Sequence, residues 1–205
     1  MIAIVDYRMG NLGSIQNMLK RIGARAVITS DAEVIAKASG LILPGVGAFD
    51  TGMENIEQLG LLPVLTAMVM DRRTPLLGIC LGMQLLTERS EEGQRPGLGW
   101  IEGETIRFRI EQKRHGLKVP HMGWNTVAVR RRDTLFRDLD EDAGFYFVHS
   151  YHVVCRREED ILATTNHEYD FVSALERGNL RATQFHPEKS HRYGMQVLRN
   201  FVELL

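Results

Sequence analysis

The chain has 205 residues, 44% of them hydrophobic and 25% charged, which is enough for the core of an ordinary globular protein. A formal net charge of −1 supplies no global field toward nucleic acid or a membrane surface. The chain has two cysteines, a first stretch unlike a signal peptide, and no apolar run of about 20 residues, so we expect a protein of the reducing cytoplasm.

Short apolar runs alternate with amphipathic segments through the first half of the chain. Four buried strands are predicted from these runs, at 2–6, 25–29, 41–44 and 75–79. Helices are predicted between them, at 11–22, from Ser30 or Asp31 onward, and in two stretches between Phe49 and Met70 that divide near Gly60. Apolar strands separated by amphipathic helices are typical of a mostly parallel sheet with helices on both faces.

The second half is rich in β-type runs from Trp100 to Thr183. The predicted strands are IEGETIRF, WNTVAVR, FYFVH, YHVVC, ILATT, FVSALE and LRATQF. Their short separations favour antiparallel pairing, and a last helix is predicted from about Tyr193 to Leu205. We therefore predict a single α/β domain over 1–205, with a mixed, mostly parallel central sheet flanked by helices. In such sheets, ligands bind beyond the carboxyl ends of the strands.

One cysteine, Cys80, lies between two glycines where a predicted buried strand meets a helical pattern. The segment Gly78-Ile79-Cys80-Leu81-Gly82 has the spacing of a nucleophile elbow, in which a sharp strand-to-helix turn strains the central residue. Side chains two places away would collide, so glycine is expected on each side. The helix start favours the thiolate, and the Leu81 N–H points to where an oxyanion would form. The alternative, a buried structural cysteine, is the interpretation that we favour for Cys155.

A thiol nucleophile needs a base, and the base needs a group that orients it. The segment Gln184-Phe185-His186-Pro187-Glu188 supplies both at the end of the LRATQF strand. His186 and Glu188 are two residues apart, so they would share one side of an extended segment, where the carboxylate can hold the imidazole tautomer. His149, in FVHSYH, is the alternative base.

Two glycines flank Val46 after the strand at 41–44, in Pro44-Gly45-Val46-Gly47. They let the backbone approach a ligand closely and rotate freely, which suits a second oxyanion donor or a loop that switches the direction of an amide. The alternative is an ordinary glycine turn at the end of a strand.

Together, GICLGMQ, QFHPEKS and LPGVGAF resemble the class I (triad) glutamine amidotransferases. The segments DYRMGNLGSI and PHMGWN add a resemblance to the glutaminase subunits of imidazole glycerol phosphate synthases, which serve histidine biosynthesis. The resemblance extends from Ile2 to the last helix. It implies a flavodoxin-like fold and an enzyme that hydrolyses L-glutamine without a cofactor or a metal.

The resemblance also implies a role for each motif residue. Cys80 would attack the side-chain amide of glutamine to give a γ-glutamyl thioester and ammonia, His186 would shuttle the proton, and Glu188 would orient His186. The oxyanion hole would comprise Val46, Gly47 and the N–H of Leu81. The residues implied to hold glutamine are Gly45, Gln84, His149, Ser150 and Tyr151.

In this family the ammonia passes into a synthase partner, which is a (βα)8 barrel in the histidine enzyme. The resemblance implies a docking face near Arg8, Asn11 and Lys189, and no partnership with nucleic acid or a membrane. Arg8 departs from the histidine-pathway pattern, and so does His191-Arg192-Tyr193-Gly194 after HPEKS.

Three alternatives stay open at this point. A paralogous glutaminase with the pattern HPEKS-H-x-Y-G feeds ammonia to an ATP-using amidotransferase, which makes an acetamidino sugar for surface polysaccharide. A regulatory module with a degenerate triad is disfavoured because Cys80, His186 and Glu188 are all present. A cysteine peptidase on a related fold is disfavoured by the match to the glutamine site.

Overall fold

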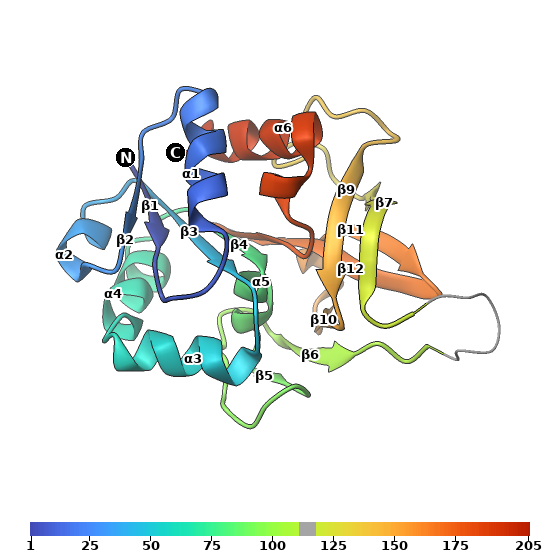
Figure 1. Cartoon of the computed structure of the whole chain (residues 1–205), viewed down its shortest axis with the longest axis horizontal. Helices are drawn as coiled ribbons and strands as arrows, with labels where there is room; N and C mark the ends of the chain where they lie inside the picture. The colour runs from blue at the N-terminus through green and yellow to red at the C-terminus, as the bar shows by residue number, and fades with distance from the viewer. Residues whose placement is uncertain (111–117) are drawn as a thin grey trace.

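The computed structural model describes residues 1–110 and 118–205, and its centre is a mixed β-sheet (Figure 1). The parallel half of this sheet has the strand order β2-β1-β3-β4-β13. Its strands are β1 (Ile2–Val5), β2 (Ala26–Thr29), β3 (Gly40–Gly45), β4 (Leu76–Cys80) and β13 (Leu180–Thr183). The four strands predicted in the first half are present, and β13, from the LRATQF run, joins them from the other end of the chain.

Helices cover both faces of the parallel half (Figure 1). One face carries α1 (Leu12–Arg21) and α6 (His191–Val202), which pack against each other. The other face carries α2 (Ala32–Ile35), α3 (Phe49–Gln58), α4 (Leu62–Thr66) with a π-helical turn at Ala67–Asp71, and α5 (Leu81–Leu85).

Successive side chains along each strand point to opposite faces of the sheet, which divides the core into two clusters. Ala3 and Val5 of β1 pack into the cluster beneath α2, α3, α4 and α5. Ile2 and Ile4 of the same strand pack into the cluster beneath α1 and α6. Because both faces are covered, these strands are apolar on both sides, which explains their continuous hydrophobic runs in the sequence.

The rest of the central sheet is mostly antiparallel and continues in the order β13-β12-β10-β6-β5, with β11 and β8 beside β12. Its strands are β5 (Arg89–Ser90), β6 (Gly103–Arg107), β8 (Ala128–Val129), β10 (Tyr151–Cys155), β11 (Ile161–His167) and β12 (Tyr169–Arg177). Short 3₁₀ turns lie at Glu158–Asp160 and Pro187–Lys189. A separate small sheet pairs β7 (His121–Thr126) with β9 (Gly144–His149) in antiparallel fashion.

The predicted α/β fold with a mixed central sheet is confirmed, and the local differences have physical reasons. The runs FYFVH and YHVVC are separated by Ser150 alone, yet β9 pairs with β7 while β10 pairs with β6 and β12. One residue cannot close a tight hairpin, so the chain passes from one sheet to the other at Ser150. The run WNTVAVR also divides between β7 and β8, and α6 begins at His191, two residues before its predicted start.

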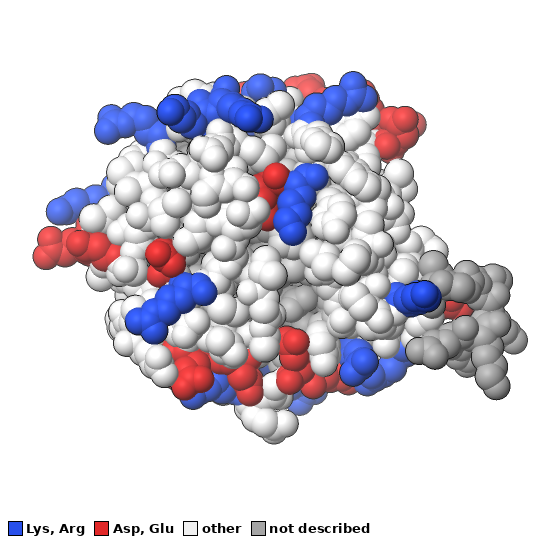
Figure 2. Space-filling model, in the orientation of Figure 1, with Lys and Arg blue, Asp and Glu red and all other residues white. Residues whose placement is uncertain are grey.

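Charged side chains of both signs lie mostly around the rim of the face in Figure 2, and the middle of that face is largely uncharged. This distribution agrees with the net charge of −1 and gives no single-sign field. Within the described ranges, no helix combines the length and the apolar character that crossing a membrane requires.

Candidate active site

Three neighbouring strands of the parallel half, β3, β4 and β13, end side by side. Their register places Gly45 beside Cys80 and Thr183 beside Ile79, so Gln184 follows next to the cysteine. Motifs that are far apart in the sequence therefore meet at one edge of the sheet. This edge is formed by the carboxyl ends of the strands, where open α/β sheets bind their ligands.

Cys80 occupies the strained turn that its flanking glycines predict. It joins β4 to α5 with φ of 52° and ψ of −106°. Such a conformation costs a residue with a side chain about 1–3 kcal/mol. A Cβ on Gly82 would lie 1.7 Å from the Leu43 carbonyl oxygen, and one on Gly78 would lie 3.0 Å from the Gly82 oxygen. Both glycines are therefore required by close backbone approach, and the Leu81 N–H begins a helix in which it has no acceptor.

His186 and Glu188 meet across a short turn rather than along the extended segment that the sequence predicts. β13 ends at Thr183, and Pro187–Lys189 form a 3₁₀ turn. The Nδ1 of His186 donates a hydrogen bond to Oε1 of Glu188 at 2.8 Å, and both side chains are 1% exposed. Because a carboxylate only accepts, the proton lies on Nδ1, and the buried Nε2 has no hydrogen-bond partner among the described residues.

The charge on His186 is set by its two neighbours. Burial disfavours the imidazolium, but the Cys80 sulfur and the Glu188 carboxylate outweigh this effect and raise the pKa of His186 to about 10. At neutral pH the site therefore favours an imidazolium between two acidic groups. An imidazolium beside a thiolate is the arrangement that activates a cysteine nucleophile.

The loop after β3 lies on the other side of Cys80. The register pairs Gly45 directly with Cys80, and a Cβ on Gly45 would lie 2.3 Å from the Tyr7 hydroxyl. Gly47 has φ of 129°, in the region that side chains rarely adopt, and Val46 is 47% exposed between the two glycines. The tight approach at Gly45 and the positive φ at Gly47 show that these glycines do more than end a strand.

A cleft of about 270 Å³ opens beside Cys80 and brings most of the predicted site residues together. The predicted residues that line it are Val46, Gly47, Cys80, Leu81, Gln84, His149, Ser150 and Tyr151. Gly45 is not among the lining residues, because it lies behind the loop against Tyr7. The lining also includes Glu92, Pro120 and Val148, which sequence reasoning did not single out.

Glu92 is the charged side chain that the sequence analysis missed. It lies after β5, and its Oε2 accepts a hydrogen bond from the Phe49 N–H at 2.9 Å. Partial burial raises the pKa of Glu92, the Phe49 N–H opposes this shift, and the nearby Asp50 carboxylate adds to it. The neighbouring Glu91 pairs instead with Arg109. The run Ser-Glu-Glu-Gly does not indicate which of its two glutamates faces the cleft, so the sequence could not predict Glu92.

His149 is not placed to act as the base. Its Nδ1 bonds the Tyr151 carbonyl at 2.8 Å and its Nε2 faces His121 Nδ1 at 3.1 Å, so both ring nitrogens are engaged. Cys155 was predicted to be buried, but it is only partly buried. Desolvation, with Asp160 nearby, raises the pKa of the Cys155 thiol to about 12, so it stays protonated at neutral pH.

The predicted interface residues lie at one end of α1 and α6. Arg8 and Asn11 are exposed in the loop that precedes α1, and Lys189 is exposed in the turn that precedes α6. Beside them, Trp124 is 53% exposed and stacks on His191 with ring centroids 5.3 Å apart. Arg8 and His191, which lie in the two segments that depart from the family pattern, both have left-handed backbones, with φ of 67° and 47°.

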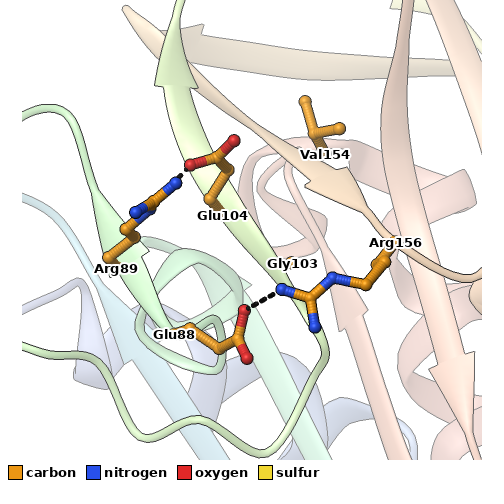
Figure 3. A pocket seen from close by; sticks show the side chains of 6 residues that line it. All are labelled: Glu88, Arg89, Gly103, Glu104, Val154 and Arg156. Carbon is orange, nitrogen blue, oxygen red and sulfur yellow. Dashed lines mark hydrogen bonds and ion pairs between the residues drawn. The ribbon is translucent and has the colours of Figure 1, made fainter.

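A second hollow lies at the far edge of the central sheet, around β5, β6 and β10 (Figure 3). Its charged side chains pair with one another: Arg89 with Glu104 and Arg156 with Glu88, each at 2.8 Å. These pairs are exposed and use none of the motif residues. Surface ion pairs of this kind contribute little to stability, and the arrangement presents no reactive group, so the candidate site is the cleft at Cys80.

The fold and this cleft define a class: an α/β protein with a cysteine elbow beside a buried histidine–glutamate pair. The family model described as glutamine amidotransferase class-I matches residues 3–204. The chain belongs to this family and is a glutamine amidotransferase.

Curated relatives match along the full chain. The chain is 52% identical to "Imidazole glycerol phosphate synthase subunit HisH 2" of Methanococcus maripaludis, over 99% of each chain. It is 49% identical to the protein of the same name from Pseudomonas aeruginosa, over 100% of each chain. Among solved structures, that of PurLQS from Thermotoga maritima has a TM-score of 0.72 at 15% identity, covering 99% of this chain and 97% of that one. This last likeness concerns the fold alone.

Replacing Glu188 with glutamine should lower the glutaminase rate by about 10²–10⁴-fold without unfolding the protein. The amide would lack the negative charge that stabilises the imidazolium, and its NH₂ group can face Nδ1 only if His186 adopts the wrong tautomer. Steady-state turnover with saturating partner, together with the thermal midpoint, measures both effects. Glu54→Gln, at a partly exposed position on α3 outside the cleft, serves as the control, and near-normal turnover in Glu188→Gln would show that another group orients His186.

Four histidines, His121, His149, His152 and His167, pack around the Phe108 ring. Burial, with His167 as a nearby like charge, lowers the pKa of His121 to about 4. Burial also lowers the pKa of His149 and of His152 below the usual range. Among the described residues, the other titratable and charged groups that face the cluster are Tyr169, whose hydroxyl lies 3.0 Å from His152 Nε2, and Glu91 and Arg109 near His152.

We expect the free energy of unfolding to fall as the pH drops from about 6.5 toward about 4, the pKa of folded His121. Over this window the unfolded chain binds protons on His121, His149 and His152 and the folded chain does not, so stability rises with pH and this contribution is complete above about pH 6.5. Each such histidine adds a slope of at most about 1.4 kcal/mol per pH unit. Urea unfolding at a series of pH values measures the slope.

Two variants separate this cluster from the other groups that titrate in acid. His121→Asn should flatten the slope, whereas His191→Asn, at an exposed position with the left-handed backbone that asparagine tolerates, should leave it unchanged. A free energy of unfolding that does not change between pH 7 and pH 5 would contradict a neutral cluster.

Proposed function

We propose that this chain is the glutaminase subunit of an imidazole glycerol phosphate synthase, which hydrolyses L-glutamine and delivers ammonia to a synthase partner for histidine biosynthesis. The proposal is carried by Cys80 at the end of β4 and by the buried His186–Glu188 pair just after the adjacent strand β13, where the Cys80 sulfur is close enough to raise the pKa of His186. Full-length identities of 52% and 49% to proteins named as subunits of that synthase support the pathway. A nucleophilic thiol must stay reduced, which fits a cytoplasmic enzyme.

The proposed reaction has two halves. In the first, the Cys80 thiolate attacks the side-chain carbonyl carbon of glutamine, and the His186 imidazolium gives its Nε2 proton to the departing ammonia. In the second, His186 takes a proton from water, which attacks the γ-glutamyl thioester and releases glutamate and the thiolate. Glu188 keeps the Nδ1 proton in place throughout, because its carboxylate accepts that hydrogen bond in both halves.

The cleft offers donors and acceptors for both ends of the substrate. The N–H of Leu81 and the Val46–Gly47 segment are the proposed donors to the oxyanion. Glu92 carries the negative charge that suits the α-ammonium group of an amino acid. Gln84 and the Ser150–Tyr151 segment, which also line the cleft, are the proposed partners of the remaining polar atoms.

The proposed docking face for the synthase comprises Arg8, Asn11 and Lys189. Two further observations support this face. Trp124 and Met122 of β7 are exposed by 53% and 62%, which is unusual for large apolar side chains. Lys189 also lies over the Tyr146 ring at 5.5 Å, and Tyr146 contacts Trp124, so the charged and aromatic groups form one continuous surface.

A second acceptor is favoured by one feature of this face. Arg8 and His191 lie in the two segments where the chain departs from the histidine-pathway pattern, Arg8 within the proposed docking face and His191 two residues after Lys189, and both have left-handed backbones. The alternative is that the ammonia serves an ATP-using synthase of an acetamidino sugar. The test is to purify the native protein under mild conditions, identify the synthase that copurifies, and measure glutaminase stimulation by each candidate. Stimulation by the acetamidino-sugar synthase alone would overturn the histidine-pathway proposal and leave the chemistry intact.

A further inference from the structure

A single backbone carbonyl, that of Tyr151, fixes the direction of a buried hydrogen-bond chain. It accepts from His149 Nδ1 at 2.8 Å and from Gln84 Nε2 at 3.1 Å. A carbonyl oxygen has no proton to give, so both partners must be donors. His149 is therefore protonated on Nδ1, and Gln84 turns its NH₂ group, not its oxygen, toward β10.

From Tyr151 toward Asn125, away from Cys80, each further group can act in only one way, as a donor or as an acceptor. The Nε2 of neutral His149 is an acceptor, so His121 donates to it from Nδ1 at 3.1 Å. This leaves Nε2 of His121 as the acceptor of the Asn125 NH₂ group at 3.2 Å. The orientation of Asn125 is fixed independently, because its nitrogen donates to the Asn166 carbonyl and its oxygen accepts from the Thr126 N–H, both at 2.9 Å.

Inward from Tyr151, the same logic reaches the catalytic sulfur. The NH₂ group of Gln84 also donates to Oε1 of Gln184 at 3.2 Å. Gln184 must therefore present its oxygen to Gln84 and its NH₂ group to the opposite side. There its Nε2 lies 3.6 Å from Cys80 Sγ, within the range of a hydrogen bond to sulfur.

Burial makes this chain of hydrogen bonds rigid. Gln184 is fully buried, and Gln84, His149 and His121 are at most 6% exposed. Reversing one amide or moving one proton would set two donors or two acceptors against each other away from water, which is costly. The members therefore hold one another in a single arrangement.

We infer that Gln184 is a further functional residue of this site: its amide donates a hydrogen bond to Cys80 Sγ and stabilises negative charge on the sulfur. Gln84, His149 and His121 act as positioning residues that fix the direction of that amide. The Gln84 NH₂ group is used by the Tyr151 carbonyl and by Gln184, and its oxygen accepts no hydrogen bond from the described residues, so this oxygen would accept a hydrogen bond from glutamine. The inference rests on the proposed role of Cys80 as the nucleophile.

The first test needs no substitution. In protein labelled with ¹⁵N-histidine at neutral pH, the imidazole ¹⁵N shifts should show His149 and His121 both protonated on Nδ1 and unprotonated on Nε2. Cross-peaks are assigned by single substitution of each histidine. Protonation of His149 on Nε2 would reverse the chain and overturn the inference.

The second test measures the sulfur directly, in a Cys155→Ala background, by its rate of alkylation with iodoacetamide as a function of pH. Gln184→Met should slow alkylation of Cys80 near pH 7 by about tenfold, since a donor to a charged group is lost. Gln184→Glu should slow it further, because its carboxylate repels the thiolate. His121→Asn should produce a smaller loss than Gln184→Met, because four groups lie between His121 and the sulfur.

The control is His152→Gln, which removes a buried histidine of the same aromatic cluster. His152 bonds Val153 and Tyr169 and none of the members of the hydrogen-bond chain that leads to Cys80. It should alkylate at the parent rate. Thermal midpoints identify folded variants, and a folded Gln184→Met that alkylates at the parent rate over the whole pH range would overturn the inference. Neither test uses glutamine or a partner, so a failure here is distinct from a failure of the proposed function, which would appear as missing glutaminase activity.

Discussion

Cys80→Ala should abolish glutamine-dependent synthesis by the complex and leave synthesis from added ammonium salt intact. Removing a nucleophile that works as a unit with its base lowers turnover by about 10⁴-fold or more. In the proposed complex the acceptor chemistry lies on the synthase chain, so ammonia from solution should bypass the missing thiol. Both rates are measured on the reconstituted complex, with glutamine or with ammonium chloride as the only nitrogen source.

Cys155→Ala is the matched control for this experiment, because it removes the other thiol. The pKa of that thiol is raised, and the thiol lies outside the cleft. It should retain both activities. The Cys80→Ala variant should also fold, because alanine at this position has no more backbone strain than the cysteine that it replaces. Loss of both activities in a complex that still assembles would contradict a role limited to ammonia supply.

The motif residues of the site can be predicted from the sequence alone, because each motif meets a local physical requirement. The glycines around Cys80 are readable from sequence because a Cβ at either position would meet backbone atoms in a tight turn. The parallel half of the sheet is readable because buried strands must be apolar on both sides.

The rest of the site depends on pairings that no local pattern encodes. Gln184 bonds Cys80 across 104 residues, and Gln84 bonds Tyr151 across 67 residues, so their roles appear only when the strands are placed. Glu92 and Glu91 are equivalent in the sequence, and the fold turns one toward the cleft and the other toward Arg109. The small β7–β9 sheet was missed for the same reason, because the residue after FYFVH gives no sign that the chain changes sheets.

The loop after β3 suggests how a partner controls the rate of glutamine hydrolysis. Gly45 is paired with Cys80 in the sheet, whereas Val46 and Gly47 leave the strand and line the cleft. Val46 is 47% exposed, and Gly47 has a φ of 129° that an alanine would resist. A peptide between two glycines rotates at low cost, and its direction decides whether an N–H or a carbonyl oxygen faces the oxyanion.

Acceptor-loaded synthase should raise the glutaminase rate of this chain by at least about 100-fold, which corresponds to about 2.7 kcal/mol of activation free energy. Without a partner, an N–H directed away from the oxyanion leaves the tetrahedral intermediate short of one donor, and a single such donor accounts for a change of about 10²–10³-fold. Docking at Arg8, Asn11 and Lys189 would act on the segment that joins β1 to α1, where Met9 lies 2.6 Å from the position a Cβ on Gly47 would take. A partner that contacts one state of the loop better than the other shifts the population of that state by the difference in affinity.

The measurement is steady-state glutamine hydrolysis by the isolated chain, by the complex, and by the complex with its acceptor. Gly47→Ala should reduce the stimulation, because its strained backbone restricts the rotation, while Gly13→Ala, in open space on α1, should not. An isolated chain that already turns over at the rate of the loaded complex would exclude gating by this loop.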